Sequence, residues 1–357
     1  MFAHRHPLEA WFDRHASQAR WHLGRTMIPC GLNLSLEETF ATGYAPSGGD
    51  PELVRLIAAW EGLPEEAILP VLGGTGGNAV AMLALAAPDR ELMVGEPAYY
   101  QWPGLVRRLA SPWRSWSPFA EHPPQPRAGQ RAWFAVSPDN PTGRKAPLER
   151  IETWLGPLDV VVVDEIYRGV REDGMAPVAG RGPGWIGIGA MSKRLGLPGV
   201  RVGWLATTDS DMLGRLHDAQ EHLAHSLPWA TTRWLVRHWE QLMAWEATSR
   251  RLADELVSIL AAQIDTWAER GFLVRVPDAG LSTLVESPAL GDDVAIAQQF
   301  ASRGIFVVPG SFVGYPGTLR ISLGFQYASS AIEALDALTD ALFALPKPTI
   351  EAAEACP

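Results

Sequence analysis

Short runs of apolar residues recur through the middle of the chain, and stretches with helical spacing separate them. Strands that are apolar on both faces and alternate with helices are typical of a parallel sheet covered on both sides. The sequence therefore predicts an α/β fold with a large domain whose mainly parallel sheet is flanked by helices. The expected strands are Leu92–Gly95, Ala132–Val136, Val160–Val163, Ile186–Ile188 and Val202–Leu205.

The pattern changes after about residue 245. An amphipathic helix is expected around residues 252–260 and a last helix around 332–342. Between them lie four short strand candidates, at Leu273–Val276, Leu281–Glu286, Ile305–Val308 and Leu319–Ser322. This texture predicts a small α+β domain. We expect a large domain over 45–245, a small domain built from 1–44 and 246–345, and a tail over 346–357.

Composition and charge narrow the class of protein. Hydrophobic residues make up 47% of the 357, which excludes disorder over most of the chain. The net charge of −10 disfavours a nucleic-acid partner. No run of 18 apolar residues and no signal peptide is recognised, so no membrane partner is expected. The two cysteines, Cys30 and Cys356, do not suggest a disulfide framework, and we expect a reducing, cytoplasmic location.

Two polar side chains follow strands of the predicted sheet. Asp164 ends the run Val160–Val163, and Asn140 lies in a turn directly after Ala132–Val136. Open α/β sheets bind ligands at the carboxyl ends of their strands, so both side chains are expected to face one crevice. Taken alone, each also fits a simpler interpretation, as a solvated acid after a strand or as part of a tight turn.

Two cations stand at positions where charge is unusual. Lys193 follows an apolar segment and precedes a Gly/Pro-rich bend, with Arg201 eight residues further along. A buried lysine near a second cation has a lowered pKa and can act as a nucleophile or base. Arg320 interrupts an apolar strand pattern and suits a carboxylate partner. A surface lysine and an edge-strand ion pair are the alternative interpretations.

The glycine run Gly73–Gly77 precedes a helical stretch, which is an arrangement that binds phosphate. It also supports a different class of protein. Residues 74–79 fit the G-x-G-x-x-G/A dinucleotide pattern, and Glu96 lies 22 residues past Gly74, where a ribose-binding acid is expected. A nicotinamide-dependent oxidoreductase is therefore one hypothesis, although it leaves Asn140, Asp164 and Lys193 without roles.

Taken together and in this order, the motifs resemble those of fold-type I pyridoxal-phosphate enzymes, specifically the class I/II aminotransferase superfamily. They are Asn-Pro-Thr-Gly at 140–143, Asp164 with Tyr167, Ser192-Lys193 with Arg201, and the late Arg320. The resemblance extends from about Tyr44 to Arg320 and implies a homodimer with shared active sites. The implied substrates are an amino acid and a keto acid, and no metal is implied.

The resemblance also implies roles for individual residues. Lys193 would hold pyridoxal phosphate as a Schiff base, Asp164 would pair with the protonated ring nitrogen, and Tyr167 with Asn140 would contact the ring oxygen. The other implied cofactor contacts are Tyr99 (or Tyr100) stacked on the ring, Gly74, Thr75 and Arg201 at the phosphate, and Tyr44 at the partner's phosphate. The implied substrate contacts are Arg320, Asn140, Gly31 and Trp229.

The reaction that the resemblance implies is transamination through the Lys193 Schiff base, a quinonoid intermediate and a ketimine. A lyase, cyclase or decarboxylase outcome stays open. Local stretches at 6–11 and 307–310 are similar to capreomycidine synthase, and Leu227-Pro228-Trp229 is similar to threonine-phosphate decarboxylase. These outcomes share one carbanion and differ in how it is reprotonated or in what leaves.

Three features shape expectations about ligands. Ala190 stands where the family usually has a hydroxyl that donates to the phosphate, so we expect weaker cofactor retention. No arginine occurs between Arg215 and Arg233, where dicarboxylate-specific relatives have one, so aspartate is not the expected amino donor. The 15 tryptophans are an excess, and Trp21, Trp102 or Trp229 is predicted to narrow the substrate pocket.

Overall fold

The computed structural model describes residues 6–34, 44–97, 101–124 and 129–346. Its largest element is a seven-stranded sheet with the strand order β2-β8-β7-β6-β5-β3-β4. All neighbouring pairs are parallel except the two that β8 makes, with β2 and with β7. The strands are β2 Ile68–Val71, β3 Arg90–Gly95, β4 Trp113–Trp116, β5 Gln130–Val136, β6 Val160–Asp164, β7 Trp185–Ala190 and β8 Gly203–Ala206.

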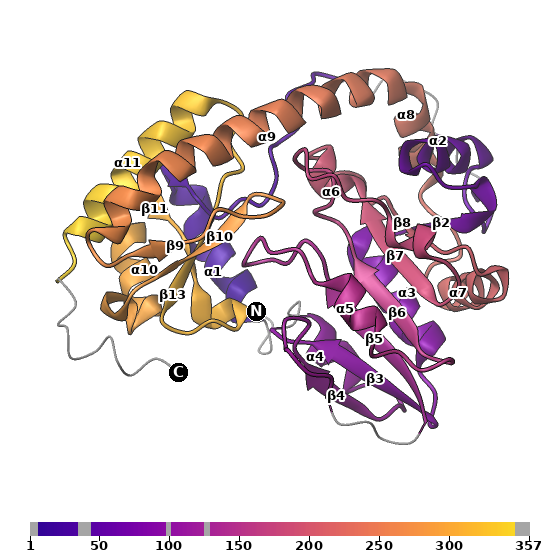
Figure 1. Cartoon of the computed structure of the whole chain (residues 1–357). Helices are drawn as coiled ribbons and strands as arrows, with labels where there is room; N and C mark the ends of the chain where they lie inside the picture. The colour runs from indigo at the N-terminus through magenta and orange to yellow at the C-terminus, as the bar shows by residue number, and fades with distance from the viewer. Residues whose placement is uncertain (1–5, 35–43, 98–100, 125–128, 347–357) are drawn as a thin grey trace.

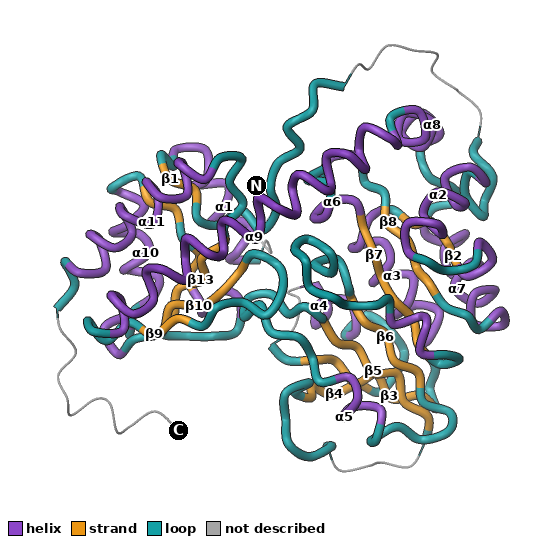
Figure 2. The backbone as a smooth tube through the Cα atoms, turned by 45° about the horizontal axis from the view of Figure 1, so that its top comes forward, coloured by secondary structure: helices purple, strands orange, loops and turns teal. Residues whose placement is uncertain are grey.

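Helices cover both faces of this sheet (Figures 1 and 2). Residues of α3, α4 and α7 pack with one set of strand side chains in a single apolar cluster, and α5 packs with another. The predicted α/β class, with a mainly parallel sheet between helices, is confirmed. These helices and their neighbours are α2 Pro51–Glu61, α3 Gly73–Leu85, α4 Gln101–Val106, α5 Leu148–Glu152, α6 Met191–Arg194, α7 Ser210–Leu223 and α8 Trp229–Arg237.

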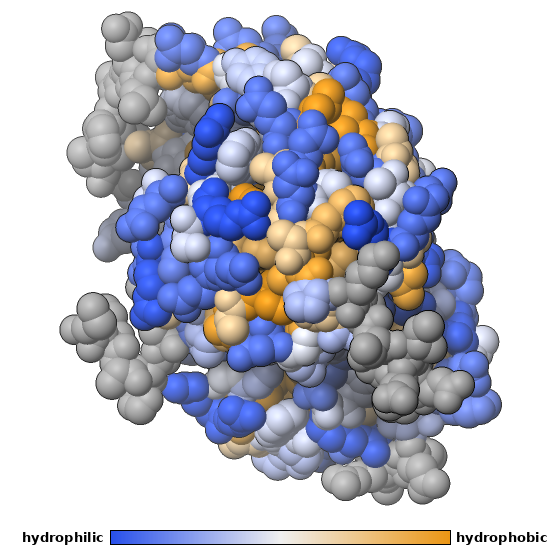
Figure 3. Space-filling view, turned by 90° about the vertical axis from the view of Figure 1, so that its left-hand side faces the viewer, coloured by the Kyte–Doolittle hydropathy of each residue, from blue (hydrophilic) through white to orange (hydrophobic). Residues whose placement is uncertain are grey.

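A second group of elements surrounds a four-stranded antiparallel sheet, ordered β12-β13-β10-β9 (Figure 1). Its strands are β9 Leu273–Val274, β10 Ser282–Glu286, β12 Val308–Pro309 and β13 Thr318–Ser322, and its helices are α10 Asp293–Ser302 and α11 Ala328–Phe343. On the outer face that Figure 3 shows, hydrophilic side chains predominate and surround smaller hydrophobic areas.

The N-terminal segment folds onto this second group. After α1 (Pro7–His15), β1 (Trp21–His22) pairs in parallel with β11 (Ile305–Phe306). The indole of Trp11 donates to the carbonyl of Val307 at 2.9 Å. Leu8 and Trp11 therefore share an apolar core with α9, α10 and α11. This pairing carries the residues after β1 toward the large sheet.

The 30-residue helix α9 (Trp239–Ala268) connects the two groups (Figure 1). It runs without a break across residue 245, so the domain boundary expected from the sequence falls inside a helix. The division into 45–245 and 1–44 with 246–345 stays a prediction. In the described part of the chain, no helix is long and apolar enough to cross a membrane.

Helix α3 begins earlier than the glycine pattern suggests. The glycines were expected to form a loop before a helix at Asn78, but Gly73 to Gly77 form its first turn. Gly73 has a φ of +66°, a conformation that other residues rarely adopt. A Cβ on Gly77 would lie 2.8 Å from the side chain of Ile188 on β7. The glycines therefore allow the helix to lie close against the sheet.

Candidate active site

Lys193 lies on the short helix α6, directly after β7 at the carboxyl end of that strand. Its Nζ donates to Oγ1 of Thr26 at 2.9 Å and lies 5.5 Å from the centre of the Tyr167 ring. Thr26 comes from the N-terminal segment and Tyr167 from the loop after β6. The amine therefore faces a site to which three separate parts of the chain contribute, and it is not a surface charge.

Asn140 is held in place by a tightly bonded turn after β5. The buried Asp139 carboxylate accepts a bond from the backbone nitrogen of Thr142 at 3.2 Å, and one from its hydroxyl at 2.5 Å. The Asn140 amide donates to the Tyr167 hydroxyl at 2.7 Å. The tight turn considered from the sequence therefore forms, and it also presents Asn140 to the same site as Lys193.

Arg320 is a buried cation on β13. Nη1 donates to Asn140 Oδ1 at 3.4 Å and Nη2 to the carbonyl of Gly24 at 3.2 Å, while Nε is buried without a hydrogen-bond partner. Burial lowers the pKa of its guanidinium to about 10. Among the described residues no carboxylate pairs with it, so the edge-strand ion pair considered for it does not form. An unpaired buried guanidinium fits an anionic ligand group.

Asp164 ends β6 and is 2% exposed. Oδ2 accepts a 2.6 Å bond from the amide of Asn78, and Oδ1 accepts a 3.2 Å bond from the backbone nitrogen of Ile166. Burial raises the pKa of the carboxyl group to about 6, against the effect of these two donors and of Lys193. Asp164 is therefore a buried acid, and the alternative of a solvated loop carboxylate is wrong.

The first turn of α3 forms a small cradle beside Arg201. A Cβ on Gly73 would lie 2.8 Å from Nη2 of Arg201, and one on Gly74 would lie 2.9 Å from Ile166 and 3.9 Å from the Cβ of Ala190. Arg201 has a φ of +54°, and Nη1 donates to the carbonyl of Pro198 at 3.0 Å. A helix N-terminus with free amides and an adjacent guanidinium fits a phosphate.

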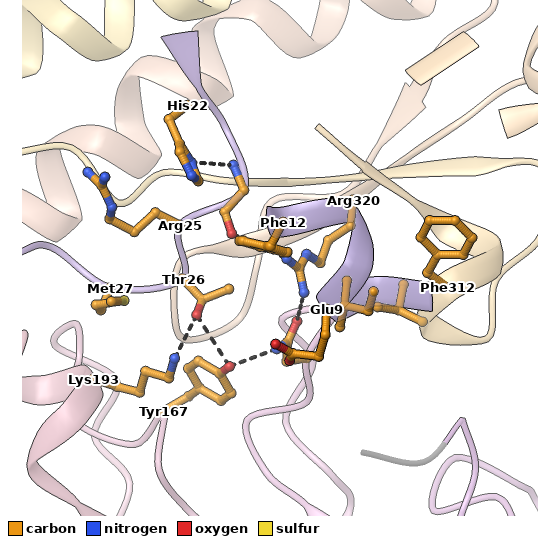
Figure 4. A pocket seen from close by; sticks show the side chains of 14 residues that line it. Glu9, Phe12, His22, Arg25, Thr26, Met27, Tyr167, Lys193, Phe312 and Arg320 are labelled. Atoms are coloured by element: carbon orange, nitrogen blue, oxygen red, sulfur yellow. Dashed lines mark hydrogen bonds between the residues drawn. The ribbon is translucent and has the colours of Figure 1, made fainter. Parts of the chain in front are cut away.

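A cavity of about 430 Å³ opens in front of Lys193 (Figure 4). Besides Lys193, Tyr167, Asn140, Arg320 and Thr26, its lining includes the half-buried Glu9 and His22. Burial and the neighbouring Arg25 lower the pKa of His22 to about 4, so this imidazole is neutral at pH 7. The rest of the lining is Leu8, Phe12, Gly24, Arg25, Met27, Phe312 and Val313.

Some of the predicted site residues lie elsewhere. Gly31 is exposed, and a Cβ there would meet the Trp245 ring at 3.1 Å, so it packs against α9 and does not line the cavity. Trp229 begins α8 and is also absent from the lining. Tyr44 is 88% exposed. Tyr99 and Tyr100 lie outside the described residues.

The tryptophan hypothesis stays a prediction. Trp21, Trp102 and Trp229 do not line the cavity in front of Lys193 in this single chain. Trp21 is taken up in the pairing of β1 with β11, because that strand attaches the N-terminal segment. Trp102 is 1% exposed and donates from its indole to Asn78 at 3.0 Å.

Three residues of the site were not found from the sequence. Thr26 and Glu9 belong to the N-terminal segment, which folds onto the small sheet through α1 and the β1–β11 pairing, and neither was singled out from the sequence. Asn78 carries a signal that was available, since a buried polar residue in the otherwise small and apolar stretch of α3 requires a partner.

Comparison with known proteins assigns the family. A model of the family described as aminotransferase class I and II matches residues 33–335. The chain is 29% identical, over 273 residues, to a histidinol-phosphate aminotransferase of Thermobifida fusca, covering 71% of this chain and 70% of that protein. It is 27% identical, over 331 residues, to a 4-dedimethylamino-4-oxo-anhydrotetracycline transaminase of Streptomyces rimosus, covering 83% and 85%.

Solved structures share the fold. A pyridoxal-phosphate-dependent aminotransferase from Streptococcus suis matches with a TM-score of 0.79 at 21% identity, over 98% of this chain and 100% of that one. The N-succinyldiaminopimelate aminotransferase of Mycobacterium tuberculosis matches with a TM-score of 0.76 at 20% identity, over 95% and 100%.

The chain therefore belongs to the class I and II aminotransferase family. It is a pyridoxal-phosphate-dependent aminotransferase, and the residues present fit that cofactor, because the glycine cradle, the buried Asp164 and Lys193 converge at one end of the large sheet. The dinucleotide-binding alternative is set aside, since it gives neither Asp164 nor Lys193 a role.

Proposed function

We propose that Lys193 binds the cofactor covalently, that the α3 N-terminus with Gly74, Thr75 and Arg201 holds its phosphate, and that Asp164 faces its ring nitrogen. Pyridoxal phosphate supplies an electron sink for the carbanion that an amino acid leaves when it loses its α-proton. With the cofactor bound, the Nζ of Lys193 would accept the α-proton of the substrate and later give it back. Tyr167 and Asn140 donate to the ring oxygen.

The observation that carries this proposal is the buried Arg320, which faces the same cavity as Lys193 and has no carboxylate partner among the described residues. An α-carboxylate bound there by two N–H groups places the amine of the substrate toward Lys193. Asn140, whose amide oxygen already accepts from Arg320, supports that position.

Replacing Arg320 tests this assignment. Arg320→Gln is expected to raise the KM for the amino donor by about 100-fold, because a two-pronged charged contact is lost. Arg320→Lys should recover only part of the loss, since an ammonium group cannot form both bonds at once. Steady-state kinetics with cofactor in excess measure both variants, and an unchanged KM in Arg320→Gln would contradict the role.

We propose that the amino donor has a neutral side chain, aliphatic or aromatic. Apolar and aromatic residues form most of the cavity wall beyond Arg320, and Glu9 places a carboxylate there. A second carboxylate on the substrate, as in aspartate, would be repelled by Glu9 in a partly desolvated space, although Arg25 offsets part of that repulsion.

The expected result is that phenylalanine has a clearly higher kcat/KM than aspartate. Glu9→Gln should narrow this preference about fivefold, by removing one like charge at partial burial. Glu52→Gln, an exposed position on α2, is the control and should leave the ratio unchanged. Aspartate turnover on a par with every neutral amino acid would rule the proposal out.

Ala190 leaves one place in the phosphate cradle without a hydroxyl. The Cβ of Ala190 faces the first turn of α3, 3.9 Å from where a Cβ on Gly74 would lie. We expect Ala190→Ser to tighten cofactor binding about fivefold, the effect of one added hydrogen bond to a charged group. Titration of apoenzyme with the cofactor measures this, with Ala268→Ser, at the exposed end of α9, as a control. Equal affinities in Ala190→Ser and wild type would refute the expectation.

The proposal includes a homodimer in which Tyr44 reaches the phosphate of the partner subunit. In one chain the Tyr44 side chain is almost fully exposed, and its ring lies edge-on to His225 with centroids 5.7 Å apart. A cytoplasmic location is also part of the proposal, and it agrees with the free thiol of Cys30.

A further inference from the structure

Three buried side chains form a chain of hydrogen bonds behind the ring-nitrogen end of the site. The indole of Trp102 donates to Oδ1 of Asn78 at 3.0 Å, and Nδ2 of Asn78 donates to Oδ2 of Asp164 at 2.6 Å. Trp102, Asn78 and Asp164 are 1%, 3% and 2% exposed. They come from α4, α3 and β6, so the contact depends on the tertiary fold.

The neighbours of Asn78 permit only one orientation of its amide. Nδ2 also donates to the carbonyl of Gly74 at 3.0 Å. An indole N–H can only donate, whereas a carbonyl and a carboxylate oxygen accept. Turning the amide over would set N–H against N–H at Trp102, and oxygen against oxygen at both Gly74 and Asp164. Trp102 therefore keeps the amide N–H group directed at Asp164.

The groups around Asp164 favour its ionised form. Both of its described partners, Asn78 and the backbone of Ile166, are donors, and they bond more strongly to a carboxylate than to a protonated carboxyl group. Full burial acts in the opposite direction and raises the pKa to about 6. Lys193 is the charged group that lowers the pKa of Asp164, while the neighbouring Glu165 accepts from Val178 on another side.

We infer that Asn78 and Trp102 are positioning residues for the cofactor. Asn78 holds the Asp164 carboxylate charged and oriented toward the ring nitrogen, and Trp102 acts through Asn78 by fixing its amide. This inference rests on the proposed role of Asp164. Both residues would act through Asp164, so their effect should depend on the ring nitrogen itself.

The test compares two cofactors. One is pyridoxal phosphate, and the other is its 1-deaza analogue, in which a C–H group replaces the ring nitrogen. The affinity ratio between them reports what the protein gains from that nitrogen. Trp102→Phe, which keeps an aromatic ring against Phe134, should reduce the ratio about fivefold, and Asn78→Leu about tenfold or more. Loss of the Asn78 bond to Gly74 affects both cofactors alike and cancels in the ratio.

Two controls separate the possible failures. Trp133→Phe removes another buried indole donor, the one to Asp159 at the opposite end of β6, and should leave the ratio unchanged. Asp164→Asn should reduce the ratio most. If Asp164→Asn leaves it unchanged, the role of Asp164 fails and the inference falls with it. If Asp164→Asn reduces the affinity ratio and Trp102→Phe does not, the role of Trp102 and Asn78 is overturned and that of Asp164 stands. This outcome does not depend on whether Asn78→Leu folds.

Discussion

Lys193→Ala is expected to abolish transamination, with a loss of at least about 10⁴-fold in kcat. The same side chain holds the cofactor and carries the substrate proton, so one change removes both functions. The purified variant should also lose the visible absorbance band that distinguishes lysine-bound cofactor from free cofactor. Absorbance spectra and assays with a panel of amino and keto acids measure the two effects.

Lys145→Ala is the matched control for that experiment. Lys145 donates to the backbone of Asp173 and is absent from the cavity lining, so its removal should leave both absorbance and turnover close to those of the wild type. Turnover by Lys193→Ala within tenfold of the wild type would show that the assignment of Lys193 is wrong.

The second large effect concerns stability. Glu61 on α2 is buried and accepts bonds from two arginines: Arg194, next to Lys193, at 2.6 Å, and Arg168, close to Tyr167. Arg194 also pairs with Glu246 on α9 at 2.9 Å. Glu61→Gln removes the carboxylate that neutralises these buried guanidinium groups. We expect it to lower the free energy of unfolding by about 3–5 kcal/mol.

Chemical denaturation of the holoenzyme measures this change. Glu172→Gln is the control, because Glu172 also pairs with an arginine, Arg250 at 3.2 Å, but its side chain is 71% exposed. An exposed pair contributes at most about 1 kcal/mol. Equal losses in the two variants would show that burial of the Glu61 cluster does not matter.

The site residues that could be predicted from the sequence are reactive side chains at the ends of predicted strands. Asp164 ends a strand of the large sheet, and Asn140 and Lys193 follow other strands, so a linear pattern of apolar runs places all three at one edge. The predicted strands agree with β3, β5, β6, β7 and β8 to within a few residues. Ile68–Val71, which contains a proline, and Trp113–Trp116, which contains an arginine, did not stand out, and they form the two edge strands β2 and β4.

The residues that sequence missed depend on contacts between distant segments. Thr26 lies 167 positions from Lys193 in the chain, and long-range bonds of its segment, such as the pairing of β1 with β11 and the bond from Arg320 to Gly24, hold it near the amine. Asn78 was counted within a glycine pattern. Its contacts with Asp164 and Trp102 are visible only in the folded chain. Gly31 and Trp229 do not line the cavity in this single chain, and their roles as substrate contacts stay predictions.

The central claim is that Lys193 carries the cofactor, and the sequence allows a direct test because it contains only three lysines, Lys145, Lys193 and Lys347. Borohydride reduction of the holoenzyme fixes the cofactor to the amine that holds it, and peptide mass spectrometry then locates the added mass. We expect one equivalent on the peptide that contains Lys193. Added mass on Lys145 or Lys347, or none on any lysine, would contradict it.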